Sequence, residues 1–546
     1  MSMITACLWV PRGAAAAFPE KYDVDEDELA RISKLAKMQL DDANDGLNDV
    51  HNDRDEDSDN ASLDSEEDNL GLQETNAQVD ADDDLKEYDL DHYDSDPLTR
   101  EGEPTTMFGN TASLAYHESN ADDPYITVQN DDEDEEREDL QILATDNMLV
   151  AAKVEDEVAH LEMYVYEDEA DNLYVHHDIM LPAIPLCVEW LDLPVGKDVN
   201  VVDPDSKGNY VAVGTFDPDI EIWDLDTIDC MYPNAILGQG GHDLKSDPAD
   251  QFKKKKRKRS KKANDRYHVD AILSLAANRQ HRNLLGSSSA DQTIKLWDLK
   301  TAKCAKSYTH HTDKVCSVAW NPRDSAILLS GSYDRTVVVA DVRAPDAKVP
   351  RWGVESDVEI VMWNPHDPDY FFVTTEDGVI HFHDTRMPPK TPETSKAVWT
   401  LHAHDESISA FDVNPTIPGF LATGSSDKTV KLWNVQASGP SMVVSRNVEV
   451  GKVFTTKFAP DSEVAFRLAV AGSKGAMQVW DTSTNAAVRK TFASRIAATD
   501  EEDKKERIIG IAEDSSDSEE EGGMEPGNNR AATANEGHNW ESMDGD

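Results

Sequence analysis

The 546-residue chain has few cysteines and few basic residues. The five cysteines are scattered, with no Cys-x-x-Cys pair, at Cys7, Cys187, Cys230, Cys304 and Cys316. An odd number without paired spacing gives no disulfide framework, so we expect a reducing intracellular compartment. Lys and Arg total 52 against 108 Asp and Glu, a formal charge of −56. This charge argues against a protein that coats nucleic acid or an anionic membrane over its whole surface.

Long apolar runs are also missing. No run approaches the ~18 residues that a membrane helix needs. The first residues, MSMITACLWVPRGAAAAF, have no basic head and are interrupted at Pro11 and Arg12, so we expect no secretory signal. Apolar residues make up 39% of the chain, below the roughly 45–50% of a soluble domain, so part of the chain is expected to stay unfolded.

The acidic residues are concentrated in separate stretches. Residues 41–100 hold 23 acidic and 3 basic residues, residues 131–139 hold eight and one, and residues 500–521 hold eleven and three. Such stretches bury too little apolar surface to offset the entropy of ordering, roughly 1–2 kcal/mol per residue. We therefore predict disordered acidic extensions at 42–140 and 497–546, with the core in 141–496.

The middle of the chain contains an internal repeat. A repeated motif appears as EIWDL, IKLWDL, VVVADV, IHFHDT, VKLWNV and MQVWDT. The position that holds Trp in most of these segments is residue 223, 297, 340, 383, 433 and 480 in turn. The gaps are 74, 43, 43, 50 and 47 residues, and four of the five match the ~40–50-residue period of propeller repeats. A seventh unit can be drawn from Asn147–Met180. Alternating apolar runs separated by Gly, Ser and Asp predict strands joined by tight turns.

These units resemble WD40 repeats. The resemblance implies an all-β fold, a seven-bladed WD40 β-propeller of four-stranded blades. It also implies a polar network in each blade, formed by a His at the blade entry, a Ser or Thr in the second strand, an Asp in the next turn and a Trp in the third strand. The matching positions are His268, Ser287, Asp291 and Trp297; His404, Thr423, Asp427 and Trp433; His311, Ser330 and Asp334, with Ala340 at the Trp position; and, in part, Asp217, Trp223 and Asp377.

A set of Ser, His and Asp could suggest a hydrolase. This set recurs in several repeats, however, whereas catalysis needs one site with an oxyanion hole. Metal ligation by the histidine pairs His381 with His383, His176 with His177, and His310 with His311 would need convergent ligands and supporting partners. We therefore expect no enzyme activity, no catalytic residues, no metal and no cofactor.

A basic run interrupts the 74-residue gap, in a loop insertion at about 240–266. Its nine cations are Lys253, Lys254, Lys255, Lys256, Arg257, Lys258, Arg259, Lys261 and Lys262. An exposed run of this composition is typical of a nuclear import signal. Contact with RNA phosphates is a second, compatible interpretation, although the run has no aromatic residue to stack on bases.

The N-terminal segment 1–41 is predicted to be a docking segment. An acidic first turn followed by Leu29, Ile32, Leu35 and Leu40 predicts a short helix at about 26–41. We expect an exposed Trp9, with Pro11 and Arg12, to dock with this helix on a partner or on the protein's own core.

Two further motifs suggest regulation. Ser65, Ser516 and Ser518 each have an acidic residue three positions later, a context that suits an acidophilic kinase. Asp341-Val-Arg343 and Asp384-Thr-Arg386 resemble, without the preceding Trp, the motif by which WD40 proteins act as substrate receptors of a cullin-RING ubiquitin ligase.

The head ITACLWVPRG, followed by FPEKYDVDEDEL, resembles the start of the periodic tryptophan protein 1 family, as does the order of acidic stretch, WD40 repeats and Ser-rich acidic tail. The resemblance implies a non-enzymatic scaffold of the nucleus and nucleolus in ribosome biogenesis, with roles in rRNA processing and large-subunit assembly. Its implied partners are pre-ribosomal assembly proteins, with pre-rRNA and histones as open alternatives, and no membrane or small-molecule substrate. A chromatin-associated regulator of ribosomal genes that binds histones is the main alternative, and a ubiquitin-ligase receptor is the second.

Overall fold

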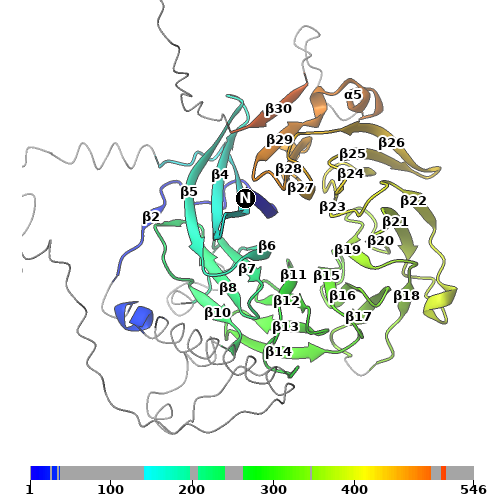
Figure 1. Cartoon of the computed structure of the whole chain (residues 1–546), viewed down its shortest axis with the longest axis horizontal. Helices are drawn as coiled ribbons and strands as arrows, with labels where there is room; N and C mark the ends of the chain where they lie inside the picture. The colour runs from blue at the N-terminus through cyan, green and yellow to red at the C-terminus, as the bar shows by residue number, and fades with distance from the viewer. Residues whose placement is uncertain are drawn as a thin grey trace, which may run out of the picture. The chain divides into compact units, whose positions relative to one another are not determined.

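The computed structural model describes residues 2–24, 28–33, 36, 140–196, 207–239, 262–344, 347–492 and 506–511. Seven four-stranded antiparallel sheets are arranged as blades around a central axis (Figure 1). The predicted seven-bladed β-propeller is confirmed.

The blades are numbered 1 to 7 in the order of their innermost strands along the chain, and each repeats one order of strands from the axis outward. The innermost strands are β1 (Ser2–Val10), β6 (Pro185–Leu191), β11 (Ile272–Ala277), β15 (Val315–Trp320), β19 (Val358–Trp363), β23 (Ala410–Val413) and β27 (Val453–Phe458). The second strands are β3 (Asn147–Glu155), β7 (Tyr210–Thr215), β12 (Leu284–Ser289), β16 (Ile327–Ser332), β20 (Tyr370–Thr375), β24 (Phe420–Gly424) and β28 (Arg467–Gly472).

The outer half of each blade follows in the same way. The third strands are β4 (Val158–Glu167), β8 (Ile220–Asp224), β13 (Ile294–Asp298), β17 (Thr336–Asp341), β21 (Val379–Asp384), β25 (Val430–Gln436) and β29 (Met477–Asp481). The outermost strands are β5 (Asn172–Leu181), β10 (Ala235–Leu237), β14 (Lys303–Tyr308), β18 (Arg351–Gly353), β22 (Trp399–His402), β26 (Gly439–Arg446) and β30 (Arg507–Gly510).

Other elements are short. The strands β2 (Glu20–Lys21) and β9 (Thr227–Ile228) pair in parallel. Short helices are η6 (Pro392–Thr394), η7 (Ser462–Val464), η8 (Thr482–Thr484) and α5 (Ala486–Phe492). No helix in the described part of the chain is long and apolar enough to span a membrane.

The core consists of apolar layers between neighbouring blades. The second strands are buried on both faces, and β7, for example, has all six residues buried. One layer joins Leu191 of β6 to Leu285 of β12 and Trp297 of β13, which belong to the next blade. Because each blade buries both faces against its neighbours, the ring is stable only when the first and last blades also meet.

The propeller begins earlier in the chain than the sequence indicated. β1 pairs along its length with β3, so Ser2–Val10 is the innermost strand of the first blade. The prediction that residues 1–41 form a separate docking segment is wrong for this part. Helical residues are described at 28–33 and 36, within the predicted helix, and Glu28 there is fully buried.

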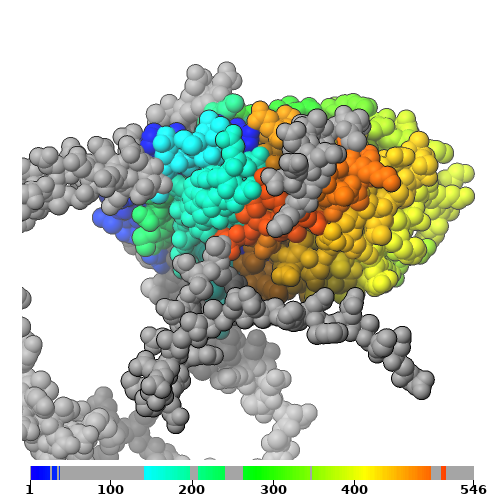
Figure 2. Space-filling model, turned by 90° about the horizontal axis from the view of Figure 1, so that it is seen from above, coloured from blue at the N-terminus to red at the C-terminus, as the bar shows by residue number. Residues whose placement is uncertain are grey.

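The propeller also ends later than predicted. Arg507–Gly510, placed in the disordered tail 497–546 by the sequence, forms β30 and pairs with all but the first residue of β29. β30 completes the last blade, and it lies beside the first blade in the ring (Figures 1 and 2). The predicted disorder of 42–140 falls largely outside the described residues, which resume at Leu140.

The innermost strands define the two faces of the ring, because all of them begin at one face, the upper face, and end at the other, the lower face. The turns between second and third strands lie on the upper face, because antiparallel pairing places them opposite the start of the innermost strand. In blade 4, for example, the Tyr333 amide donates to the Lys314 carbonyl just before β15.

Candidate functional site

Two blades contain the complete predicted polar network. In blade 3, His268 Nδ1 lies 3.0 Å from Asp291 Oδ2 and Nε2 lies 2.7 Å from Ser287 Oγ, while Trp297 Nε1 donates to that oxygen at 2.8 Å. A carboxylate only accepts hydrogen bonds, so Nδ1 carries the proton and Nε2 accepts from the Ser287 hydroxyl. The bonds therefore run in one direction, from Trp through Ser and His to Asp.

Blade 6 repeats this arrangement with a threonine. His404 lies 2.8 Å from both Asp427 and Thr423, and Trp433 Nε1 donates to the Thr423 hydroxyl at 3.0 Å. In each blade a Thr two residues after the Asp donates to the same carboxylate, at 2.6 Å from Thr293 and 2.7 Å from Thr429.

Blade 4 has a shortened network. His311 contacts Asp334 at 3.1 Å and Ser330 at 2.9 Å, and Ala340 occupies the position of the Trp. The partial sets in blades 2 and 5 are not brought together: Asp217 and Asp377 are exposed. Trp223 is buried and donates instead to Glu221 at 3.2 Å.

Two of the network histidines have pKa values below the usual range. Burial lowers the pKa of His268 and of His404, although the facing aspartate acts in the opposite direction. Burial alone would raise the pKa of Asp291, but hydrogen bonds and charge from His268, with a bond from Thr293, lower it to about 2. Each network is thus a fixed set of satisfied polar groups that joins the blade entry to two strands, which is a bracing role.

The WVPRG motif joins the first blade to the last at the lower face. Trp9 has 7% of its surface exposed, so the expectation of an exposed Trp9 is wrong. Its indole Nε1 donates to the Lys457 carbonyl of β27 at 2.9 Å. The Arg12 amide donates to Asp461 at 3.1 Å, and its side chain donates to Asn147 at 2.7 Å and pairs with Glu463. Pro11 lies between these anchors and is half-buried.

The seam, which is the contact between the first and last blades, is also closely packed at its upper end. Gly475, at the turn between β28 and β29, has φ +71°, and a Cβ there would lie 1.8 Å from Ser2 Oγ. A side chain at this position would therefore push the start of β1 out of the blade. The N-terminal strand is held at both of its ends.

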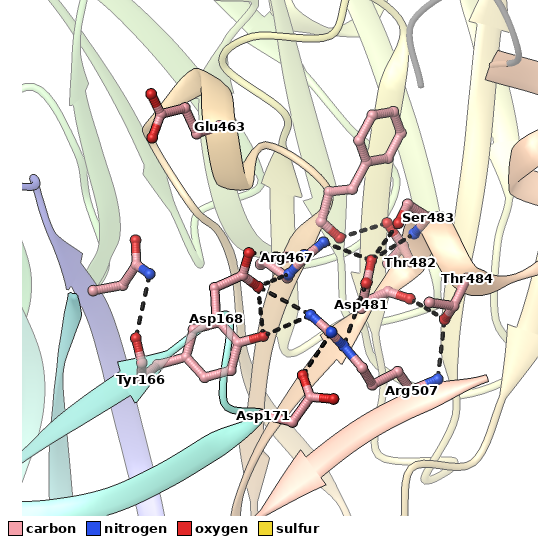
Figure 3. Close-up of polar contacts among 12 residues, drawn as sticks. Tyr166, Asp168, Asp171, Glu463, Arg467, Asp481, Thr482, Ser483, Thr484 and Arg507 are labelled. Atoms are coloured by element: carbon pink, nitrogen blue, oxygen red, sulfur yellow. Dashed lines mark hydrogen bonds and ion pairs between the residues drawn. The ribbon is translucent and has the colours of Figure 1, made fainter. Parts of the chain in front are cut away.

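A second set of contacts closes the outer part of the seam (Figure 3). Asp168, in the turn between β4 and β5, accepts from Arg467 of β28 at 2.7 and 3.1 Å and from Arg507 of β30 at 3.0 Å. Tyr166 donates to the same carboxylate at 2.9 Å. Arg467 also pairs with Asp481 at 2.7 Å.

The carboxylate at the centre of these contacts is held in its charged form. Burial alone would raise the pKa of Asp168, but the hydrogen bonds and charge of Arg467, with Tyr166 and Arg507, lower it. Arg507 additionally pairs with Asp171 at 2.6 Å. The first residue of β30 thus links the last blade to the first blade.

The centre of the ring contains a cavity of about 920 Å³. Its walls come from β1, β6, β11, β15, β19 and β27, with Ser409 just before β23. Its upper part is lined by Phe216, Tyr333 and Glu359, and its lower part by Arg279 and Lys457. A volume in the range of about 300–1,000 Å³ can take one or a few side chains of a partner.

The arginines of the ligase-like motif lie on the lower face and are paired within their own blades. Arg343 Nη2 pairs with Asp341 at 2.8 Å, and Arg386 Nη2 pairs with Asp384 at 2.8 Å. Arg386 also lies over the Tyr370 ring, 5.1 Å from its centre. Both side chains are more than half exposed.

The remaining sites that the sequence predicted are the basic run, the serines and the histidines. Of the basic run, Lys262 is described and is exposed. The rest of the run and Ser65, Ser516 and Ser518 lie outside the described residues. His383 takes the Trp position in blade 5, buried against Phe371 with ring centres 5.4 Å apart. Groups of three or more possible metal ligands are absent from the described part of the chain.

Comparisons with known proteins agree with this geometry. The family model described as "WD domain, G-beta repeat" matches residues 263–298, 302–341 and 395–434. These three ranges contain the three networks built on His268, His311 and His404. A WD repeat-containing protein of Schizosaccharomyces pombe, described as uncharacterized, is 51% identical over 95% of this chain and 96% of that protein.

Periodic tryptophan protein 1 of Saccharomyces cerevisiae is 38% identical, over 90% of each chain. The chain belongs to the periodic tryptophan protein 1 family. A Drosophila melanogaster homolog of periodic tryptophan protein 1 is 29% identical over 90% of this chain and 96% of its own. In this member of the family, the WVPRG motif that carried the resemblance is a structural part of the ring.

Proposed function

We propose that this protein is a non-enzymatic scaffold of the nucleus and nucleolus that acts in rRNA processing and assembly of the large ribosomal subunit. The proposal is supported by membership in the periodic tryptophan protein 1 family together with a propeller fold, which generally serves as a protein-interaction platform.

The central cavity is the observation that carries the scaffold role. Its walls are preformed, because the innermost strands that line it are held by the networks and by the seam. A rigid opening can accept a segment of a pre-ribosomal assembly protein without first paying the entropy of ordering its own walls. The basic run Lys253–Lys262 serves nuclear import in this account.

The experiment is affinity purification of the tagged full-length chain from cells, with sequencing of bound RNA and mass spectrometry of bound proteins. We expect pre-ribosomal RNA and large-subunit assembly proteins to be enriched over a tagged unrelated propeller. Absence of both would overturn the proposal.

A second candidate is a chromatin-associated, histone-binding regulator of ribosomal genes. It is favoured by the carboxylate and aromatic groups, Glu359 and Tyr333, that line the upper part of the cavity. The same purification separates the two candidates, because recovery of histones with ribosomal-gene DNA, and without pre-ribosomal RNA, would support this one.

A further inference from the structure

The cations at the lower mouth of the central cavity are matched by carboxylates. Arg279 pairs with Glu189 of the neighbouring blade at 2.8 Å and lies over the Trp190 ring at 5.4 Å. Lys457 lies 3.9 Å from Asp412, also across a blade boundary. These pairs join neighbouring blades, and they leave the lower mouth close to neutral.

The upper mouth has a different balance of positive and negative charge. Glu359 is the second residue of β19 and lines the cavity beside Tyr333. Asp357 and Glu376 stand close to it, since the Glu376 amide donates to the Asp357 carbonyl at 3.0 Å. Among the residues that the structure describes, the cation paired with this group is Arg335, which contacts Asp357 at 3.0 Å.

The charges of Asp357, which is half-buried, and of Glu376, which is exposed, act on Glu359. Burial, followed by the charges of Glu376 and Asp357, raises the pKa of Glu359 to about 7, against a weak hydrogen bond from Ser407 at 3.4 Å. Burial and Glu359 also raise the pKa of Tyr333 to about 12. A positive charge placed here would relieve the repulsion, whereas a phosphate would add to it.

The cavity wall below Glu359 is largely apolar. Leu186, Val188 and Ile360 contribute to it, and Phe216 stands at the upper mouth with 59% of its surface exposed. An occupant that suits both regions has a cationic end and an apolar stem, which describes the side chains of lysine and arginine.

We propose that the upper mouth of the central cavity receives a lysine or arginine side chain from an extended basic segment of a partner protein. Glu359 accepts hydrogen bonds from the cation, and Tyr333 and the apolar wall pack against its stem. The inference rests on the proposed scaffold function and adds the chemistry of the partner that this site recognises.

The test uses the full-length chain and fluorescence anisotropy with a labelled peptide of alternating lysine and alanine. We expect saturable binding that Glu359→Gln weakens by about 10-fold or more, because a charge-assisted hydrogen bond is lost. The matched control is Glu449→Gln, which removes the same charge from an exposed residue of the upper face. This control should bind as the wild type does, and a peptide of alternating glutamate and alanine should not bind.

Folding is checked by the melting temperature, which Glu359→Gln should leave unchanged or raise, because it removes repulsion. Equal binding by Glu359→Gln and wild type would overturn the inference, as would equal weakening by Glu449→Gln. Affinity that rises when Lys253–Lys262 is deleted would also overturn it, in favour of the chain's own basic run as the occupant.

The inference and the proposed function fail separately. A chain that recovers pre-ribosomal RNA in cells, but whose Glu359→Gln variant binds the peptide as tightly as the wild type, would overturn the inference alone and leave the proposed function standing. A wild-type chain that binds the peptide through Glu359 but recovers no pre-ribosomal material would overturn the proposed function and leave the binding site standing.

Discussion

The substitution Asp168→Asn tests the seam between the first and last blades. Asp168 accepts hydrogen bonds from Arg467, Arg507 and Tyr166, and its side chain is 26% exposed, against 12% for Arg467 and 28% for Arg507. An asparagine keeps one acceptor oxygen but loses the charge. Hydrogen bonds to charged groups contribute about 1.5–3 kcal/mol, so we expect the free energy of unfolding to fall by about 2–3 kcal/mol.

The expected change in melting temperature follows from the size of the ring. Roughly 350 folded residues at about 2.1 cal/mol/K each give an unfolding entropy of about 0.7 kcal/mol/K. A loss of about 2–3 kcal/mol then lowers the melting temperature by about 3–4 °C. Thermal unfolding followed by tryptophan fluorescence measures this change.

Asp171→Asn is the matched control for this substitution. It removes the same charge from the same turn, but Asp171 pairs with Arg507 alone among the described residues and is 47% exposed. Such a pair contributes about 1 kcal/mol or less. Equal effects of the two substitutions would refute the account in which Asp168 is the centre of the seam.

The pH dependence gives a further check. The native pKa of Asp168 is lowered, so its contribution is present above the unfolded value of about 3.9 and is lost as the pH falls through the native value. The difference between wild type and Asp168→Asn should therefore shrink below about pH 4. A difference that stays constant into acid would contradict the assignment of a charged carboxylate.

Three substitutions test buried polar groups of the blades, and one deletion tests the basic run. Ser287→Ala leaves both His268 Nε2 and Trp297 Nε1 without their partner, whereas Ser330→Ala leaves only His311 Nε2 without one. In urea unfolding, Ser287→Ala should therefore lower the free energy of unfolding by about 1 kcal/mol more than Ser330→Ala does. Equal losses would show that the tryptophan hydrogen bond adds nothing. His383→Phe should raise stability by about 1 kcal/mol, because neither buried imidazole nitrogen of His383 has a hydrogen-bond partner of normal geometry. Burial, followed by His381, lowers the pKa of His383 to about 4. Between about pH 6.5 and 4 the unfolded chain therefore binds a proton that the folded chain does not bind, and the gain in stability from His383→Phe should grow over this range. A pH-independent difference would argue against a neutral native His383. Deletion of Lys253–Lys262 should move a fluorescently tagged chain from the nucleus to the cytoplasm, and an unchanged nuclear signal would remove the import role.

The repeated third-strand motif was enough to predict most of the ring. Its spacing identified six blades, and the strands of Asn147–Met180 supplied the seventh. The resemblance to WD40 repeats implied the networks of His268 and His404, and the structure contains both.

The ends of the ring were missed for physical reasons. β1 pairs with β3, which begins at Asn147, and the strongly acidic stretch between them made the two look unrelated. β30 has four residues, Arg507–Gly510, set among acidic residues, so its composition resembles the tail. A count of strands in each repeat could have predicted both ends of the ring. The unit Asn147–Met180 has only three strands, and the last repeat likewise lacks an outer strand.

The upper mouth could not be found from sequence. Glu359, Tyr333 and Phe216 come from three different blades, and nothing in their local motifs relates them. They line one cavity only because the ring places the upper ends of the blades around a common axis. The local sequence around Trp9 likewise indicated exposure, because its contact with Lys457 depends on ring closure.

Hydrogen exchange of the full-length chain, followed by mass spectrometry, tests ring closure by the chain's two end strands most directly. If Ser2–Val10 and Arg507–Gly510 complete the first and last blades, their paired amides will exchange slowly, as slowly for Ser2–Val10 as for β27 beside it. Rapid exchange of Ser2–Val10, at the rate of an unstructured peptide while β27 stays protected, would contradict this account.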